Sequence, residues 1–396
     1  MERITGVISR GLRAPIIREG DNIKDIVIET VLKASRLEGF TIQDRDIIGI
    51  TESVVARAQG NYADIHAIAQ DVRSKFGGGT IGVIFPILSR NRFAICLKGI
   101  ARGADKIVLM LNYPSDEVGN HLIDIELLDE KGVNPYTDEL TEEQFRNYFG
   151  YHKHTFTGVD YIEYYKSIAE EAGVPCEIIF SNNPRTILKY TRNVLACDIH
   201  TRNRTKKTLK ENGAEKVYGL DDILTAPVNG SGFNEEYGLL GSNKATETTV
   251  KLFPRNCQEL VESIQKELKE KTGKTVEVLV YGDGAFKDPV GKIWELADLV
   301  VSPGYTKGLE GTPHEVKLKY LADNEFAGLT GKELEKAITE YIRNKHAKNE
   351  DDMVSQGTTP RRLTDLIGSL CDLTSGSGDK GTPIIYIQNY FDSYSR

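Results

Sequence analysis

The chain has 396 residues, of which 39% are hydrophobic and 27% charged, a balance typical of globular proteins that bury an apolar core. This length predicts about two or three domains. The formal net charge is −8, which argues against a general nucleic-acid-binding protein, because phosphate neutralisation needs clustered lysine and arginine. We therefore expect no nucleic-acid partner.

The sequence also lacks the features of a membrane or exported protein. It contains no run of about 18 apolar residues, so we expect no membrane span and no membrane partner. The first residues lack the apolar stretch of a signal peptide. The five cysteines form no C-x-x-C pair, which is typical of free thiols in a reducing compartment. These features predict a cytoplasmic protein.

Helices and strands alternate in the first part of the chain. Asp21 is a suitable cap for a first helix, because apolar residues recur at helical spacing after it. Further helices are predicted over residues 62–76 and from Phe93 onward. Short apolar runs between these helices predict buried strands at residues 46–50, 81–85 and 106–111. Alternating helices and strands favour an α/β architecture.

The composition changes between residues 115 and 228, where tyrosine, threonine, glutamate and histidine become frequent. Strands are predicted at 177–180 and near 196–199, followed by a basic helix over 202–211. We interpret residues 115–228 as an inserted α/β subdomain. The remaining residues, 1–114 and 229–396, would form a discontinuous core domain, and the fold class is α/β (mixed α+β).

The last part of the chain returns to a regular pattern after a flexible joint at residues 229–232. Apolar spacing predicts a helix from Cys257 to the residue before Gly273. A strand at 276–281, a helix after Thr330, a helix at 360–372 and a strand at 384–387 follow.

The first candidate site is the Gly282-Asp283-Gly284 turn, which follows the strand predicted at 276–281. Ligands collect beyond the carboxyl ends of strands in open α/β sheets. A carboxylate at this position could hold Mg²⁺ or Mn²⁺, which prefer oxygen ligands. The alternative interpretation is an ordinary Asp-Gly turn.

The second candidate is a loop rich in glycine and hydroxyl groups between the last predicted helix and strand. Such a loop can bind phosphate through backbone N–H groups, although it lacks the Walker A spacing. A flexible connection is the alternative. The loop consists of Ser375, Gly376, Ser377, Gly378, Asp379, Lys380, Gly381 and Thr382.

Two further polar groups follow predicted strands. Arg57 lies in the segment after the strand at 46–50, where its guanidinium could bind phosphate, although by itself the segment is better explained as a solvent-facing helix start. Asp116, Glu117 and His121 follow the strand at 106–111 and could ligate a metal, but a solvated loop is the simpler interpretation.

Several segments together resemble the coenzyme F-420 (F-420-0) gamma-glutamyl ligase family. Ala14, Pro15, Ile16 and Ile17 resemble the opening segment that touches the nucleotide in that family. Glu52, Ser53 and Arg57 fall where family members contact GTP, with Arg57 in place of a lysine.

The resemblance continues after the predicted insert. Residues 238–243 resemble the family's Gly-Ile-Asp-x-Ser-Asn segment, which would bring Ser242 and Asn243 to the nucleotide and places Leu240 where the family has a metal-binding aspartate. Residues 377–383 resemble the closing nucleotide loop. The resemblance covers roughly the first 60 and last 160 residues, and the middle of the chain has no counterpart in it.

The resemblance implies a homodimeric ligase that uses GTP (or ATP) and Mg²⁺ or Mn²⁺ to add L-glutamate to a carboxylate acceptor through an acyl phosphate. Asp283 and Asp379 would bind the metal, and no catalytic residue is assigned. The residues expected to bind the nucleotide are Ala14, Pro15, Ile16, Ile17, Glu52, Ser53, Arg57, Ser242, Asn243 and the eight residues of the loop 375–382.

Two other functions remain open at this point. Leu240, in place of an aspartate, favours a non-catalytic nucleotide-binding or regulatory protein on the same scaffold. The unfamiliar middle of the chain favours a gamma-glutamyl ligase for a different acceptor, such as a folate or a peptide-like metabolite.

Overall fold

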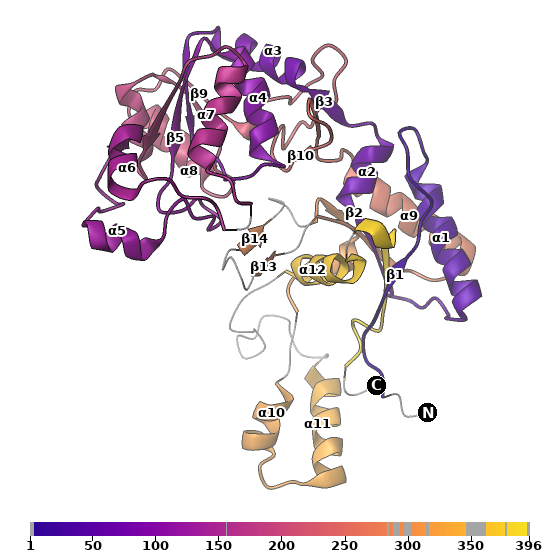
Figure 1. Ribbon diagram of the computed structural model, residues 1–396. Coiled ribbons are helices and arrows are strands. Elements are labelled where there is room, and N and C mark those ends of the chain that lie inside the picture. The colour runs from indigo at the N-terminus through magenta and orange to yellow at the C-terminus, as the bar shows by residue number, and fades with distance from the viewer. Residues whose placement is uncertain are drawn as a thin grey trace.

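The computed structural model describes residues 4–155, 157–282, 285–287, 294–296, 302–313, 317–345, 362–376 and 378–393. Two lobes, each built on a large sheet, lie side by side, and a helical hairpin projects below them in the view of Figure 1. Both ends of the chain belong to the same lobe, where the first and last strands pair (Figure 1). The α/β class predicted from the sequence is confirmed.

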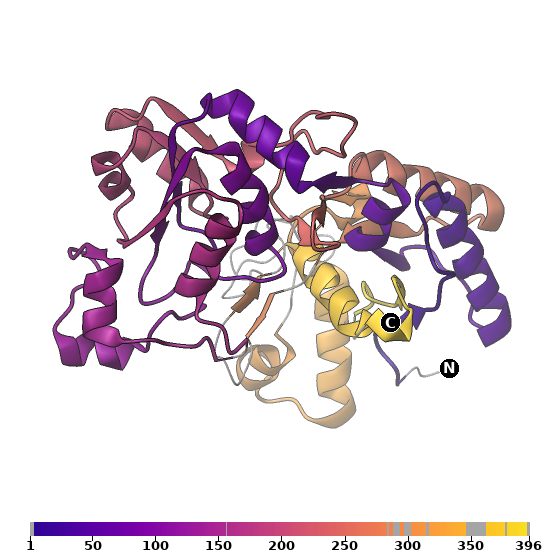
Figure 2. The ribbon, with the colours of Figure 1, turned by 45° about the horizontal axis from the view of Figure 1, so that its top comes forward.

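The first lobe is a three-layer structure around a five-stranded sheet. Only β2 and β12 run parallel; every other neighbouring pair in the sheet is antiparallel. Helices α1 and α9 pack on one face and α12 packs on the other (Figures 1 and 2). The strands in spatial order are β1 (Ile8–Leu12), β16 (Ile384–Gln388), β2 (Ile47–Thr51), β12 (Glu277–Tyr281) and β15 (Gly304–Tyr305). The helices are α1 (Ile23–Glu38), α9 (Cys257–Thr272) and α12 (Leu363–Ser375).

The central strand β2 shows why the sheet is covered on both sides. Successive side chains of a strand point to opposite faces, so Ile48 and Ile50 pack against α1 and α9 while Ile47 packs against α12. Between them, a side chain at Gly49 would collide with the sulfur of Cys371 on α12. Glycine at this position therefore lets α12 lie close to the sheet.

The second lobe contains a six-stranded sheet with five parallel strands. Taken in chain order, these five strands occupy the spatial order third, second, first, fourth, fifth, which is a doubly wound arrangement. The short β6 is antiparallel at one edge. The strands in spatial order are β6 (Leu140–Thr141), β7 (Cys176–Phe180), β5 (Lys106–Leu111), β4 (Thr80–Ile84), β8 (Asn193–Ala196) and β9 (Lys216–Gly219).

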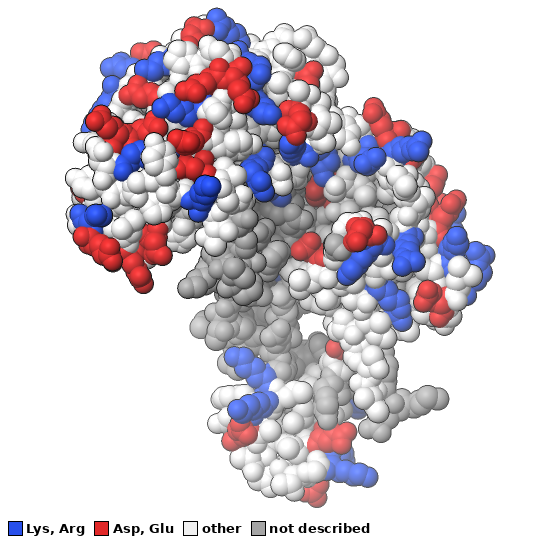
Figure 3. Space-filling model, viewed as in Figure 1, with Lys and Arg blue, Asp and Glu red and all other residues white. Residues whose placement is uncertain are grey.

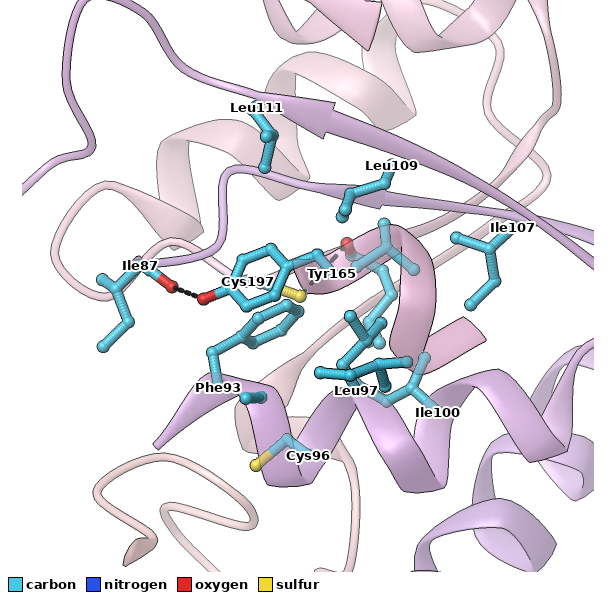
Figure 4. Close-up of a cluster of buried hydrophobic side chains, with 14 of the residues drawn as sticks. Ile87, Phe93, Cys96, Leu97, Ile100, Ile107, Leu109, Leu111, Tyr165 and Cys197 are labelled. Carbon is cyan, nitrogen blue, oxygen red and sulfur yellow. Dashed lines mark hydrogen bonds between the residues drawn. The ribbon is translucent and has the colours of Figure 1, made fainter. Parts of the chain in front are cut away.

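Helices cover both faces of this second sheet. On one face, the buried hydroxyl of Tyr165 donates a hydrogen bond of 2.7 Å to the carbonyl of Ile87, which anchors the loop after β4 beside Phe93 (Figure 4). The helices of that face include α3 (Ile65–Phe76), α4 (Phe93–Gly103), α5 (Ile125–Lys131), α6 (Glu142–Phe149) and α7 (Tyr161–Glu171). The opposite face is covered by α8 (Arg202–Glu211) and a 3-10 helix, Pro184–Lys189.

A small sheet connects the lobes, and its strands are β10 (Asn243–Lys244), β11 (Thr249–Lys251) and β3 (Tyr62–Asp64). The projecting hairpin consists of α10 (Leu318–Tyr320), a π-helical turn and α11 (Gly331–Lys345), closed by a small apolar cluster. A two-stranded ribbon is formed by β13 (Ala285–Lys287) and β14 (Trp294–Leu296).

The strand pairing bears on the division into domains. The boundary expected between residues 114 and 115 falls inside one sheet, because β4 and β5 precede it and their partners β7 and β8 follow it. The division of the chain remains a proposal, and this pairing favours starting the second unit before β4 rather than after β5.

Three local predictions were wrong. The helix expected from residue 62 begins at Ile65, because residues 62–64 form β3 and the Asp64 side chain caps α3. The strand expected near 196–199 lies at Asn193–Ala196. Asn22 rather than Asp21 caps α1.

Three other properties can be stated for the described residues. All five cysteines are free thiols, as the sequence predicted. No helix in the described ranges is both long and apolar enough to cross a membrane. Acidic and basic side chains are interspersed over the face of both lobes seen in Figure 3.

Candidate functional site

A cavity of about 450 Å³ lies beyond the carboxyl ends of β2 and β12, whose last residues are Thr51 and Tyr281. Ligand sites of open α/β sheets occur at such strand ends. Helix α2 (Glu52–Ala58) begins directly after β2 and contributes a second wall. The described lining residues are Ala14, Pro15, Ile16, Ile17, Thr51, Ser53, Val54, Arg57, Tyr281, Asp372, Ser375, Gly376, Gly378, Gly381, Thr382 and Pro383.

Three segments that are far apart in the sequence meet in this cavity: the opening segment 14–17, the start of α2, and the closing loop. Backbone hydrogen bonds connect them. The N–H of Ala14 donates to the carbonyl of Gly381 at 3.1 Å, and the N–H of Thr51 donates to the carbonyl of Pro383 at 3.0 Å. Main-chain hydrogen bonds of the first lobe therefore hold the segments around the cavity together.

The α2 wall presents a hydroxyl and a cation. Ser53 and Arg57 lie four residues apart, which places them on the same face of the helix. Arg57 is exposed, and its guanidinium has no hydrogen bond or ion pair within the part of the chain that the structure describes. Glu52 faces away, is buried, and pairs with Lys251 (Nζ to Oε1 3.3 Å). Glu52 is thus beside the cavity but absent from its described lining.

The closing loop, residues 375–383, supplies a further wall of hydroxyls and backbone. The hydroxyl of Thr382 donates a hydrogen bond of 2.9 Å to the carbonyl of Ser375, which ties the two ends of the loop together. Gly376 has a φ of 61° and lies against the Lys380 ammonium, so a side chain there would clash. Asp379 and Lys380 are not part of the described lining, and Ser377 lies outside the described residues.

The segment around Ser242 and Asn243 lies elsewhere. The Ser242 hydroxyl is buried 3.4 Å from the sulfur of Cys96, and Asn243 lies in β10 opposite Lys251 of β11. Leu240 is 3% exposed and belongs to the apolar core of the second lobe. None of these three residues lines the described part of the cavity.

Asp283, the first metal ligand expected from the sequence, lies outside the described residues. Within the described ranges, no group of three or more His, Cys, Asp or Glu side chains is arranged to hold a metal ion. One carboxylate, that of Asp372 near the end of α12, does line the cavity, together with the hydroxyl-bearing residues Thr51 and Thr382. Mg²⁺ is commonly held by one or two carboxylates together with substrate phosphates, so this oxygen-rich wall fits a metal that is shared with a phosphate ligand.

Sequence reasoning missed Asp372, and it assigned no binding role to Thr51 or Tyr281, although both stand at the start of candidate segments. Asp372 falls within an apolar helical pattern and looked like an ordinary polar position, although it is the last acidic residue before the glycine-rich loop. Thr51 and Tyr281 end β2 and β12, and the rule that ligands collect at strand ends pointed to the segments that follow them, Asp283 and Arg57 included.

The Asp116 group is structural rather than a solvated loop. Asp116 is buried and accepts hydrogen bonds from the N–H groups of Leu88 (2.8 Å) and Asn120 (2.8 Å). Burial raises the pKa of its carboxyl above the usual range. Glu117 accepts from the N–H groups of three successive residues, 199–201, and so holds the loop after β8.

The fold is that of an α/β protein with a cavity at the strand ends of its first sheet. Comparison with known families gives a more specific result: the family model described as F420-0:Gamma-glutamyl ligase matches residues 11–389. The limits of this match enclose both lobes, including the middle of the chain that the resemblance from sequence had left out. The chain belongs to this family of ligases. No curated protein matches the chain.

Proposed function

We propose that this chain is a nucleotide- and divalent-metal-dependent ligase that joins L-glutamate through an amide bond to a carboxylate acceptor. The observation that carries the proposal is the convergence of three segments, 14–17, 51–57 and 375–383, on one cavity. This cavity combines a glycine-rich loop, several hydroxyl groups and the Arg57 cation. Those groups suit a ligand that is anionic at one end.

The nucleotide, GTP or ATP, would be oriented by the two ends of the cavity. Arg57 offers a fork of N–H donors to phosphate oxygens, and the hydroxyl of Ser53 can donate to the same group. Ile16 lines the cavity yet is 82% exposed. An exposed apolar side chain at a cavity rim is suited to packing against the flat face of a base.

The proposed metal would be held by Asp372 and the phosphates, with Asp283 as a further candidate ligand. When bound, Mg²⁺ or Mn²⁺ neutralises negative charge on the transferring phosphoryl group. The chain's own contribution is to position: Arg57 and Ser53 fix the phosphates, and the closing loop covers them.

The proposed reaction consists of a phosphoryl transfer followed by an acyl transfer. In the first, a carboxylate oxygen of the acceptor bonds to the γ-phosphorus, the bond to the bridging β,γ-oxygen breaks, and a nucleoside diphosphate leaves. In the second, the amine nitrogen of glutamate bonds to the acyl carbon, the bond to the phosphate oxygen breaks, and phosphate and a proton are released. The products are an amide, a nucleoside diphosphate and inorganic phosphate.

The acceptor named in the family description is F420-0, and we propose it as the first acceptor to test. A folate or peptide-like acceptor remains the alternative. A homodimeric state and a cytoplasmic location are also proposals.

Phosphate release by the purified full chain tests the function. The assay contains Mg²⁺ or Mn²⁺, GTP or ATP, glutamate, and one acceptor from a panel of F420-0, folates and gamma-glutamyl peptides. Phosphate should appear only when acceptor and glutamate are both present, and mass spectrometry should show an acceptor heavier by one glutamyl residue. Arg57→Ala should lower nucleotide affinity by about 1.5–3 kcal/mol, the usual contribution of a hydrogen bond to a charged group. Arg36→Ala, which removes an exposed arginine from α1, is the matched control.

Leucine at position 240, where the family has an aspartate, raised a second candidate function from the sequence. If the chain binds nucleotide but extends no acceptor on the panel, a regulatory nucleotide-binding protein on the same scaffold is the better explanation. If it binds neither nucleotide nor metal, the proposed ligase function is wrong for this chain.

A further inference from the structure

A buried lysine lies behind the α2 wall of the cavity. Lys251 belongs to β11, in the small sheet that connects the lobes, and its side chain is 12% exposed. Its Nζ donates to the Ser53 hydroxyl oxygen at 2.6 Å and to Glu52 Oε1 at 3.3 Å. These partners are almost 200 positions away in the sequence, so the contact exists only in the folded chain.

The direction of these hydrogen bonds determines what Ser53 can do. A lysine ammonium has three donors and no acceptor, so the Ser53 oxygen must accept the bond from Lys251. The hydroxyl proton of Ser53 is then directed to a different acceptor. Ser53 lines the cavity, and an anionic ligand there would provide that acceptor.

The charge of Lys251 lies in an ion pair that is largely shielded from water. Glu52 is 7% exposed at its side chain and pairs with the ammonium, so both charges are largely shielded from water. Charges in such a position are screened by salt much less than surface charges. Within the described residues, the third N–H of Lys251 has no acceptor.

We propose that Lys251 is a positioning residue for the phosphates of the nucleotide. It orients the Ser53 hydroxyl so that its proton points to a phosphate oxygen, and it places a shielded positive charge directly behind that hydroxyl. This inference rests on the proposed nucleotide-dependent function. It also connects the phosphate end of the cavity to β11 and, through the pairing of Lys251 with Asn243, to β10.

The test is nucleotide binding by calorimetry, with the full chain and Mg²⁺. GTP and ATP are compared with guanosine and adenosine, which lack phosphates. Lys251→Met should weaken triphosphate binding about tenfold or more, leave nucleoside binding unchanged, and be largely rescued in Lys251→Arg. The double variant Lys251→Met with Ser53→Ala should bind triphosphate as tightly as whichever single variant has the lower affinity. The two changes should not add, because both remove the same contact.

Two controls separate positioning from folding. Lys244→Met makes the same substitution one strand away, where the lysine pairs with exposed Glu247, and should not change triphosphate binding. Lys251→Met alone removes one cation from beside the buried Glu52 carboxylate, which can unfold the chain. The pair Lys251→Met with Glu52→Gln removes both charges and should fold while showing the same loss of triphosphate binding.

The outcomes distinguish this inference from the proposed function. If the parent chain binds triphosphate and either Lys251→Met or its pairing with Glu52→Gln binds it as tightly, the inference is wrong while the function stands. Equal losses of nucleoside and triphosphate binding would also overturn it, because the role would then be structural. If the parent binds no nucleotide, the proposed function fails and the inference fails with it.

Discussion

Substituting Gly49 should disturb the sheet, the helix above it and the cavity together. The β-carbon of an alanine at this position would collide with the sulfur of Cys371 and would lie 3.3 Å from both the Cys371 β-carbon and Tyr281 Cδ1. Because Gly49 is in the central strand, the strand cannot move aside without disturbing its two neighbours. Overpacking of this kind costs about 1–3 kcal/mol, so Gly49→Ala should lower the free energy of unfolding by that amount.

The same substitution should also affect the ligand site. Helix α12 carries Asp372 and Ser375 into the cavity, and it is the element that must move away from an alanine at position 49. We therefore expect weaker nucleotide binding in Gly49→Ala even though Gly49 does not line the cavity. Urea unfolding followed by circular dichroism measures the stability, and calorimetry measures the affinity.

Two further variants test whether the contact between position 49 and Cys371 causes the loss of stability. Cys371→Ala removes the colliding sulfur, so the pair with Gly49→Ala should be more stable than the two single losses added together, by about 1 kcal/mol. Gly328→Ala is the matched control, because a β-carbon there meets nothing within 4 Å. If the losses of stability in the two single variants simply add, or if Gly49→Ala is as stable as the parent, the packing of α12 does not depend on the absence of a side chain at position 49.

Three other predictions follow from the burial and position of single residues. Asp372→Asn should weaken nucleotide binding in the presence of Mg²⁺ and have much less effect without metal; calorimetry under both conditions checks this. Leu240→Asp should destabilise the chain by about 3 kcal/mol or more in urea unfolding, with no gain in metal affinity, because the new carboxylate would be buried without a partner. Burial raises the pKa of Cys96 to about 11 and that of Cys257 to about 12. At pH 8 roughly 0.1% or less of each thiol is then ionised. A thiol-reactive dye should therefore label neither Cys96 nor Cys257 until denaturant is added. Labelling of either of these two cysteines in the native chain at pH 8 would contradict the prediction.

Local pattern predicted most elements of this fold because the signal lies within each segment. The apolar run of residues 47–50 and the helical spacing after Cys257 both became elements close to the expected bounds. The order of strands in the sheets could not be predicted in the same way. It depends on contacts between distant segments, such as β4 with β8, and a boundary drawn from composition at residue 114 therefore fell inside a sheet.

The cavity shows the same limit. The loop 375–382 and the segment with Arg57 were candidates from local pattern, and the segment 14–17 came from the family resemblance; the structure brings all three together. Lys251 and Asp372 carry no local signal, because a lysine in a short strand and an aspartate in a helix are ordinary surface residues in a sequence. Only the fold places Lys251 behind Ser53 and Asp372 at the cavity wall.

The position of Leu240 bears on the choice between a ligase and a regulatory protein. In a doubly wound sheet, the crevice at the strand ends where the order reverses is a common ligand site; here it lies between β4 and β8. Residues 239–242 pack into this crevice, and the void they leave there is only about 30 Å³. Leucine at position 240 is therefore explained by core packing in the second lobe. Its segment does not line the larger cavity, so the absence of an aspartate at this position says little about metal binding there. The ligase proposal depends instead on Asp372 and Asp283, and the comparison of Asp372→Asn with and without Mg²⁺ tests that dependence directly.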